Sequence, residues 1–172
     1  NLRASGVEFD LRRATPYLQY DKVDFKIPTF SEGDSLARYF VRADEVRESA
    51  KIVRQVLQLM TPGDIKANLP KSVLPQKAEV YSKMEELIHD FMIVNFGINP
   101  PVGEVYHAIE GSKGELGFYI VSKGEGHPWK CKIRSPSFIH IQSLPHLVKG
   151  RMISDVVAII GSIDPIMGEA DK

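Results

Sequence analysis

Apolar side chains spaced three and four residues apart predict two long helices. The first begins after Gly33-Asp34 and ends before Thr61-Pro62-Gly63, and one face of it is apolar. The second is expected from about residue 77 to 96, where Gly97 is suited to end it in a left-handed conformation. The apolar face of the first helix carries Leu36, Tyr39, Phe40, Ala43, Val46, Ala50, Val53, Leu57 and Met60. In the second helix we expect the apolar side chains to face inward, namely Tyr81, Met84, Leu87, Ile88, Phe91 and Met92.

The apolar period changes to two after Asn99-Pro100-Pro101, which indicates β-strands. Residues 105–109 and 116–120 alternate between the two faces of a sheet, and the glycine-containing segment 110–114 joins them as a hairpin. Residues 129–133 alternate in the same way and predict a third strand. The sequence therefore predicts a small antiparallel sheet between helices.

The remaining segments complete an α+β, mostly helical chain that we expect to form a single domain over residues 1–172. Residues 1–33 hold turn signals and little periodicity, so we expect an irregular arm. Long helices occupy 34–97 and the sheet occupies 102–134. Residues 136–172 hold a short helix capped at Ser135, a last helix over 152–163, and a tail.

Composition narrows the class of protein. The chain has 172 residues, with 22 Lys plus Arg and 22 Asp plus Glu. Its formal net charge is therefore zero, and no overall positive charge favours binding to nucleic acid. The longest clean apolar run is 156–160, far short of a membrane span, so any membrane association would be through partner proteins. Cys131 is the only cysteine, which excludes an internal disulfide and a four-thiolate iron-sulfur cluster.

The candidate chemistry lies in the tail and at the end of the third strand. Asp164 precedes Pro165, which disfavours helical backbone, and it lies at the negative end of the last helix, so its anion needs a cation or donors. Arg134, if buried, needs an acidic partner, for which Asp164 or Glu169 would serve. The structural alternative is that Asp164 makes local turn bonds, that Glu169 is exposed at a frayed end, and that Arg134 is on the surface.

The sequence predicts no metal or cofactor site in this chain. The five histidines lack zinc spacing, and His89 is expected to be a satisfied core histidine. Gly111 and Gly114, like Gly124 and Gly126, lack the strand-turn-helix context of a dinucleotide loop. We interpret Lys113 and Lys123 as loop charges.

Five segments in order along the chain resemble the quinone-site subunit of the NADH-quinone oxidoreductases of respiratory complex I, the D-type subunit. The tail is similar to the Asp-Pro-Cys-x-x-Cys motif of nickel-iron hydrogenase large subunits, but Ile166 and Glu169 occupy the two cysteine positions, so the soft metal ligands are missing. Asp90 stands where the family has a second histidine. The five segments are 6–17 with Tyr20, 87–91, 113–122, 132–138 and 164–172.

The resemblance implies a hydrogenase-large-subunit-like helical core, with the chain being the C-terminal portion of a longer subunit. It also implies that the former metal cavity is part of a quinone chamber, in which Asp164, Ile166, Glu169 and Arg134 are pocket candidates. In this family quinone is the substrate, and the electrons come from an iron-sulfur cluster in a partner subunit. The implied partners are that cluster-bearing subunit and the membrane-arm subunit of the quinone channel.

The implied function is electron transfer to quinone within a proton-translocating NADH-quinone oxidoreductase. The implied location is peripheral, on the cytoplasmic or matrix face of the energy-transducing membrane. We expect the isolated chain to be inactive, because the electron donor, the N-terminal half of the pocket and the membrane arm lie outside it. Two alternatives stay open: the equivalent subunit of a complex that uses a deazaflavin or ferredoxin donor, and a non-catalytic assembly scaffold of the same fold.

Overall fold

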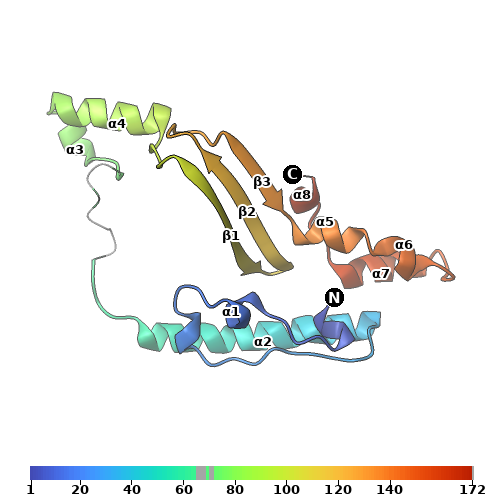
Figure 1. Cartoon of the computed structure of the whole chain (residues 1–172). Helices are drawn as coiled ribbons and strands as arrows, with labels where there is room; N and C mark the ends of the chain where they lie inside the picture. The colour runs from blue at the N-terminus through green and yellow to red at the C-terminus, as the bar shows by residue number, and fades with distance from the viewer. Residues whose placement is uncertain (65–68, 70–71, 172) are drawn as a thin grey trace. The chain divides into compact units, whose positions relative to one another are not determined.

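The computed structural model describes residues 1–64, 69 and 72–171, and the chain divides into two compact units. One unit comprises Asn1–Met60, Ala108–Gly117 and Ile133–Lys172, and the other comprises Thr61–His107 and Phe118–Lys132. Figure 1 shows the helices and the small sheet in chain order. The first unit contains every residue of the candidate site described below.

The first long helix, α2, spans Ser35–Leu59, as the periodicity predicts. The side chain of Asp34 caps it by accepting a hydrogen bond from Ala37 N at 2.7 Å. The predicted apolar face is not the buried one, however. The buried residues are Ala37, Arg38, Val41 and Ile52, whereas most of the longer apolar side chains of the predicted face are exposed.

The arm that precedes α2 packs along this buried face. It contains the short helices η1 (Arg3–Ser5), α1 (Leu11–Ala14) and η2 (Tyr20–Lys22) in otherwise irregular chain, as expected. Two small apolar clusters join the arm to α2. One contains Ala4, Ala37 and Val41 beside Phe30, and the other contains Val23, Phe25 and Ile52 beside Tyr20 and Ile27.

The second predicted helix is divided in the structure. α3 spans Lys77–Val80 and α4 spans Met84–Phe96, with Lys83 in an extended conformation between them. Gly97 ends α4 at a positive φ of 72°, although its ψ of −166° is not that of the expected left-handed cap. None of the α4 residues is buried, so its expected inward face is uncovered in the described part of the chain.

The sheet has the predicted antiparallel hairpin and third strand. β1 (Gly103–Gly111), β2 (Gly114–Ser122) and β3 (Lys130–Arg134) follow one another in the order β1-β2-β3 (Figure 1). The hairpin loop consists of two residues only, 112 and 113, so it is tighter than the predicted connection. Gly126, between β2 and β3, admits no side chain, because a Cβ there would lie 1.5 Å from the carbonyl oxygen of Phe96.

The C-terminal region consists of four helices. Ser135 caps α5 (Pro136–Ile141) by accepting from Phe138 N, as predicted. α7 (Asp155–Ile163) is the predicted last long segment, shortened at its start, and it packs against α2. The sequence did not indicate α6 (Leu144–Val148) or α8 (Met167–Ala170), which is the tail itself.

The mixed class with a small antiparallel sheet is therefore confirmed. The single domain over 1–172 stays a prediction. Within the described residues, no helix is both long enough and apolar enough to cross a membrane.

Candidate functional site

Asp164 lies at the C-terminal end of α7 in a left-handed conformation, with φ 54° and ψ 55°. This conformation is uncommon for a residue other than glycine. The backbone N–H of Asp164 donates to Ile160 O at 2.9 Å and closes the helix. The chain then leaves α7 through Pro165, as the sequence predicts. The Asp164 side chain projects away from the helix end.

Two arginines of α2 hold this end of α7. Arg42 donates to Ser162 O at 2.6 Å and to Gly161 O at 3.3 Å, and Arg38 Nε donates to Ser162 Oγ at 3.0 Å. The last carbonyls of a helix lack partners within the helix and carry partial negative charge, so guanidinium groups stabilise them. α2 thereby fixes the position from which Asp164 projects.

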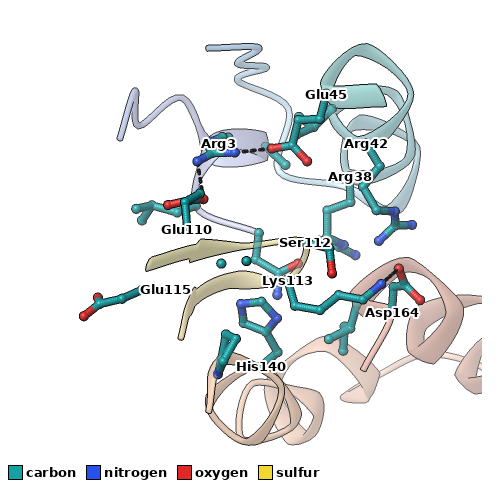
Figure 2. A pocket seen from close by; sticks show the side chains of 18 of the residues that line it. Arg3, Arg38, Arg42, Glu45, Glu110, Ser112, Lys113, Glu115, His140 and Asp164 are labelled. Carbon is teal, nitrogen blue, oxygen red and sulfur yellow. Dashed lines mark hydrogen bonds and ion pairs between the residues drawn. The ribbon is translucent and has the colours of Figure 1, made fainter. Parts of the chain in front are cut away.

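Lys113, at the tip of the β1–β2 hairpin, forms an ion pair and a hydrogen bond with Oδ2 of Asp164 (Figure 2). The lysine side chain is 16% exposed and the aspartate side chain is 43% exposed. The pair supplies the cation that an anion at a helix C-terminus needs. Lys113 does lie in a loop, as expected, but its charge is paired and largely buried, and the separation of 51 positions along the chain explains why no local pattern indicates the pairing.

Ser137 holds the rest of the tail. Its hydroxyl group is fully buried, donates to Glu169 Oε2, and accepts a hydrogen bond from Ile166 N at 3.2 Å. One side chain of α5 thus contacts both the carboxylate of Glu169 and the backbone of Ile166, the two positions that the sequence resemblance aligns with thiolates. The sequence marks Ser137 as part of a helix cap but gives no sign of this second role.

Arg134 does not pair with either tail carboxylate. Its guanidinium donates to Glu115 O at 2.5 Å and lies 3.5 Å from the Glu115 carboxylate. The expected partner, Asp164 or Glu169, is therefore wrong: the neighbouring strand β2 offers a carboxylate nearer than the tail does. Arg134 is 39% exposed, so it is only half-buried.

A second charged cluster, which sequence reasoning missed, ties the arm to the same hairpin. Arg3 pairs with Glu45 of α2 and with Glu110 of β1 at 2.6 Å (Figure 2). It also pairs with Asp10 at 3.1 Å. Burial alone would raise the pKa of Asp10, but the hydrogen bonds and charge of Arg12, together with Arg3, lower the pKa below its usual value. The cluster anchors the hairpin that carries Lys113.

These groups border a cavity of about 870 Å³ in the first unit. Asp164 and Arg134 line it, as do Lys113 and His140. Figure 2 shows the labelled side chains around it. In the described part of the chain, Ile166 and Glu169 are not among its lining residues; they lie just beyond Asp164, in the segment held by Ser137.

His140 is a further titratable group at the cavity. Its Nδ1 atom is buried and has no hydrogen-bond partner among the described residues. Burial is the largest cause that lowers the pKa of His140, while Glu169 acts in the opposite direction. His89 in α4 also has a buried nitrogen, Nε2, without a partner in the described residues, so it is not the satisfied core histidine that we expected.

The described residues contain no cluster of three or more His, Cys, Asp or Glu side chains that could hold a metal ion. Cys131 is exposed on β3. What the arrangement offers instead is a cavity with a lysine-aspartate pair, an arginine and a histidine at its wall, next to an ordered apolar and acidic tail. Such a site can bind a polar group and exchange protons with it.

Comparison with known proteins places the chain in a family. Residues 1–172 match the family described as respiratory-chain NADH dehydrogenase, 49 Kd subunit. A protein of Chloroherpeton thalassium, named as a D-type subunit of NADH-quinone oxidoreductase, is 59% identical over 172 residues, which is 100% of this chain and 39% of that protein.

Relatives from two other organisms carry the same subunit name. The proteins of Salinibacter ruber and Methylacidiphilum infernorum that carry the same subunit name are 55% and 52% identical, and the alignments cover 100% of this chain and 38% and 41% of those proteins. The chain thus spans about two fifths of the length of the curated relatives it matches. With a family match over its whole length, the chain belongs to the family of the 49 Kd subunit of respiratory-chain NADH dehydrogenase.

Proposed function

We propose that this chain forms one wall of the quinone-binding site in the 49 Kd subunit of a proton-translocating NADH-quinone oxidoreductase. The observation that carries the proposal is the ordered tail beside the cavity, where Asp164 pairs with Lys113 and Ser137 holds both Ile166 and Glu169. The names of the relatives, which specify NADH and quinone, support this donor and acceptor over a deazaflavin or ferredoxin complex.

The four site residues divide into polar and apolar roles. Asp164 and Arg134 line the cavity and provide charge at its wall. Ile166, 46% exposed in this structure, provides an apolar surface for a quinone ring or tail. Glu169, next to it in the same segment, provides a titratable group for proton exchange. The helices would belong to the hydrogenase-like core of the longer subunit.

The proposed reaction converts quinone to quinol by uptake of two electrons and two protons. The electrons would come from an iron-sulfur cluster held by a partner subunit, and the protons would pass through carboxyl and imidazole groups at the wall. The second partner would be the membrane-arm subunit that admits the quinone, which makes this subunit peripheral to the membrane. This chain would orient the quinone and supply protons without holding a redox group itself.

The test separates quinone reduction from the upstream reaction in the assembled complex. Glu169→Gln keeps the size of the side chain but removes its titratable group, so quinone reduction should fall about tenfold or more. Ile166→Ala removes apolar surface and should raise the KM for quinone. Electron transfer from NADH to ferricyanide should stay at its original rate in both variants.

Lys130→Met, an exposed change on β3, is the control and should alter neither activity. If the Glu169 and Ile166 variants assembled fully and reduced quinone with normal kcat and KM, the tail would be a structural terminus and the proposal would fail.

A further inference from the structure

Lys113 is a largely buried cation at the cavity. It occupies the two-residue loop between β1 and β2, and its side chain is largely buried and lines the cavity. The arm anchors the hairpin, because Glu110 accepts hydrogen bonds from Arg3 at 2.6 Å and from Leu11 N at 3.1 Å. The ammonium group itself is held by Asp164.

The ammonium group has hydrogen-bonding capacity beyond its known partner. A lysine has three N–H donors, and in the described residues its Nζ bonds to Asp164 Oδ2 alone. The remaining donors belong to a side chain that lines the cavity. Ligand groups that match an ammonium donor in an otherwise partly apolar cavity are carbonyl and anionic oxygens.

The arginines that line the cavity are bonded to other groups, Arg3 to Glu45 and Glu110 and Arg12 to Asp10 among them. Arg38 and Arg42 donate to the end of α7, and Arg134 donates to Glu115 O. His140 has a lowered pKa, caused first by burial, so it is biased towards the neutral form. Lys113 thus combines a positive charge, a cavity position and unused donors.

We propose that Lys113 both positions Asp164 and binds a carbonyl oxygen of the quinone, which makes it a substrate-binding residue of the proposed reaction. This inference rests on the proposed function. Its ammonium group would also stabilise the negative charge that develops on that oxygen as electrons arrive from the partner's iron-sulfur cluster. The quinone accepts two electrons from that cluster, and each of its two oxygens gains one proton from the carboxyl and imidazole groups at the wall. Lys113 forms no covalent bond and loses no proton, so its charge is unchanged after quinol leaves.

The experiment uses the assembled complex with a short-chain quinone. Lys113→Met keeps most of the apolar stem but removes charge and donors, so the KM for quinone should rise about tenfold or more and kcat should fall. Lys113→Arg keeps charge and donors and should recover most of the affinity. Lys132→Met, an exposed lysine of β3, is the matched control, and NADH-to-ferricyanide activity reports on assembly.

A double variant separates the two roles of Lys113. If the lysine only neutralised Asp164, then Lys113→Met combined with Asp164→Asn would have the KM of Asp164→Asn alone. Direct binding of quinone predicts that the double variant keeps the additional rise in KM. A KM equal to that of Asp164→Asn would overturn the inference.

The set of variants also distinguishes this inference from the function on which it rests. If Glu169→Gln and Asp164→Asn impaired quinone reduction while Lys113→Met did not, the role of Lys113 would be wrong and the site would stand. If all three variants were normal, the proposed function itself would fail. Should Lys113→Met not assemble, Lys113→Gln takes its place. It is neutral but retains a donor, so the expected rise in KM is smaller, and an unchanged KM would again overturn the inference.

Discussion

At the scale of single residues, the tail depends on side chains that lie far from it in sequence. The hydroxyl of Ser137 forms hydrogen bonds with Glu169 and with the backbone of Ile166, and Lys113 pairs with Asp164. Removing a partner that satisfies a buried group usually costs about 1–3 kcal/mol, which is large for one hydroxyl. The geometry of the site is therefore set by groups that no sequence motif marks as functional.

His140 should titrate below its ordinary pKa of 6.5, because burial disfavours the imidazolium. Stability gained by keeping it neutral is fully present above about pH 6.5 and is lost as pH falls towards the lowered pKa. Hydrogen exchange at the imidazole C2 position in the assembled complex measures this pKa directly. Glu169→Gln, which removes a negative charge, should lower the pKa further, whereas Arg134→Gln should raise it.

A His140 pKa at or above 6.5, or shifts of the opposite sign in the two variants, would contradict the electrostatic account of the cavity.

The sequence predicts part of this residue-scale picture. The exit of the chain from α7 at Asp164 follows from Pro165, because that rule is local. The partner of Arg134 does not follow, because sheet register decides that Glu115 is nearer than the tail. Lys113 carries no local signal that separates a buried pair from a solvated loop charge.

At the scale of elements, periodicity predicts α2 and the three strands well, but it does not predict which side of a helix is covered. α2 buries the small residues Ala37 and Val41 beneath the arm, while Leu36, Tyr39 and Val46 are exposed. Burial depends on what packs against a helix, and the periodic pattern does not contain that information. The break between α3 and α4 also went unpredicted, because residues 81–83 include no glycine or proline.

The contact of α2 with the end of α7 can be tested by Arg42→Met. Loss of the guanidinium leaves Ser162 O and Gly161 O without this donor, so the last turn of α7 should open more easily, by about 1 kcal/mol. Amide hydrogen exchange at residues 160–164 should quicken several-fold. Arg54→Met, an exposed change on the same helix, is the control. Unchanged protection at these amides would show that α7 ends without help from α2.

At the scale of the whole molecule, much apolar surface lies uncovered. In α4, Leu87, Ile88, Phe91 and Phe96 are each about half exposed, and no residue of this helix is buried. Patches of this kind mark surfaces that pack against other chain segments or proteins. The relatives are about two and a half times as long as this chain, and they form subunits of an oxidoreductase according to their names.

The uncovered face of α4 should make the isolated chain self-associate. Substituting Ile88 and Phe91 together by lysine should reduce association in sedimentation velocity experiments, because the change removes apolar area and adds charge. Glu85→Lys adds positive charge to the same helix without removing apolar area, and it should leave association largely unchanged. If all forms were equally monomeric at micromolar concentration, this face would not be an interaction surface.

The most direct test of the central claim is to locate bound quinone by photolabelling. A quinone analogue with a photoreactive group on its ring, irradiated in the assembled complex, should label the hairpin tip around Lys113 or the segment from Asp164 to Glu169. Unmodified quinone in excess should suppress the label, and the cross-linked residues can be identified by mass spectrometry. Suppressible labelling confined to other subunits or to other parts of this chain would contradict the account.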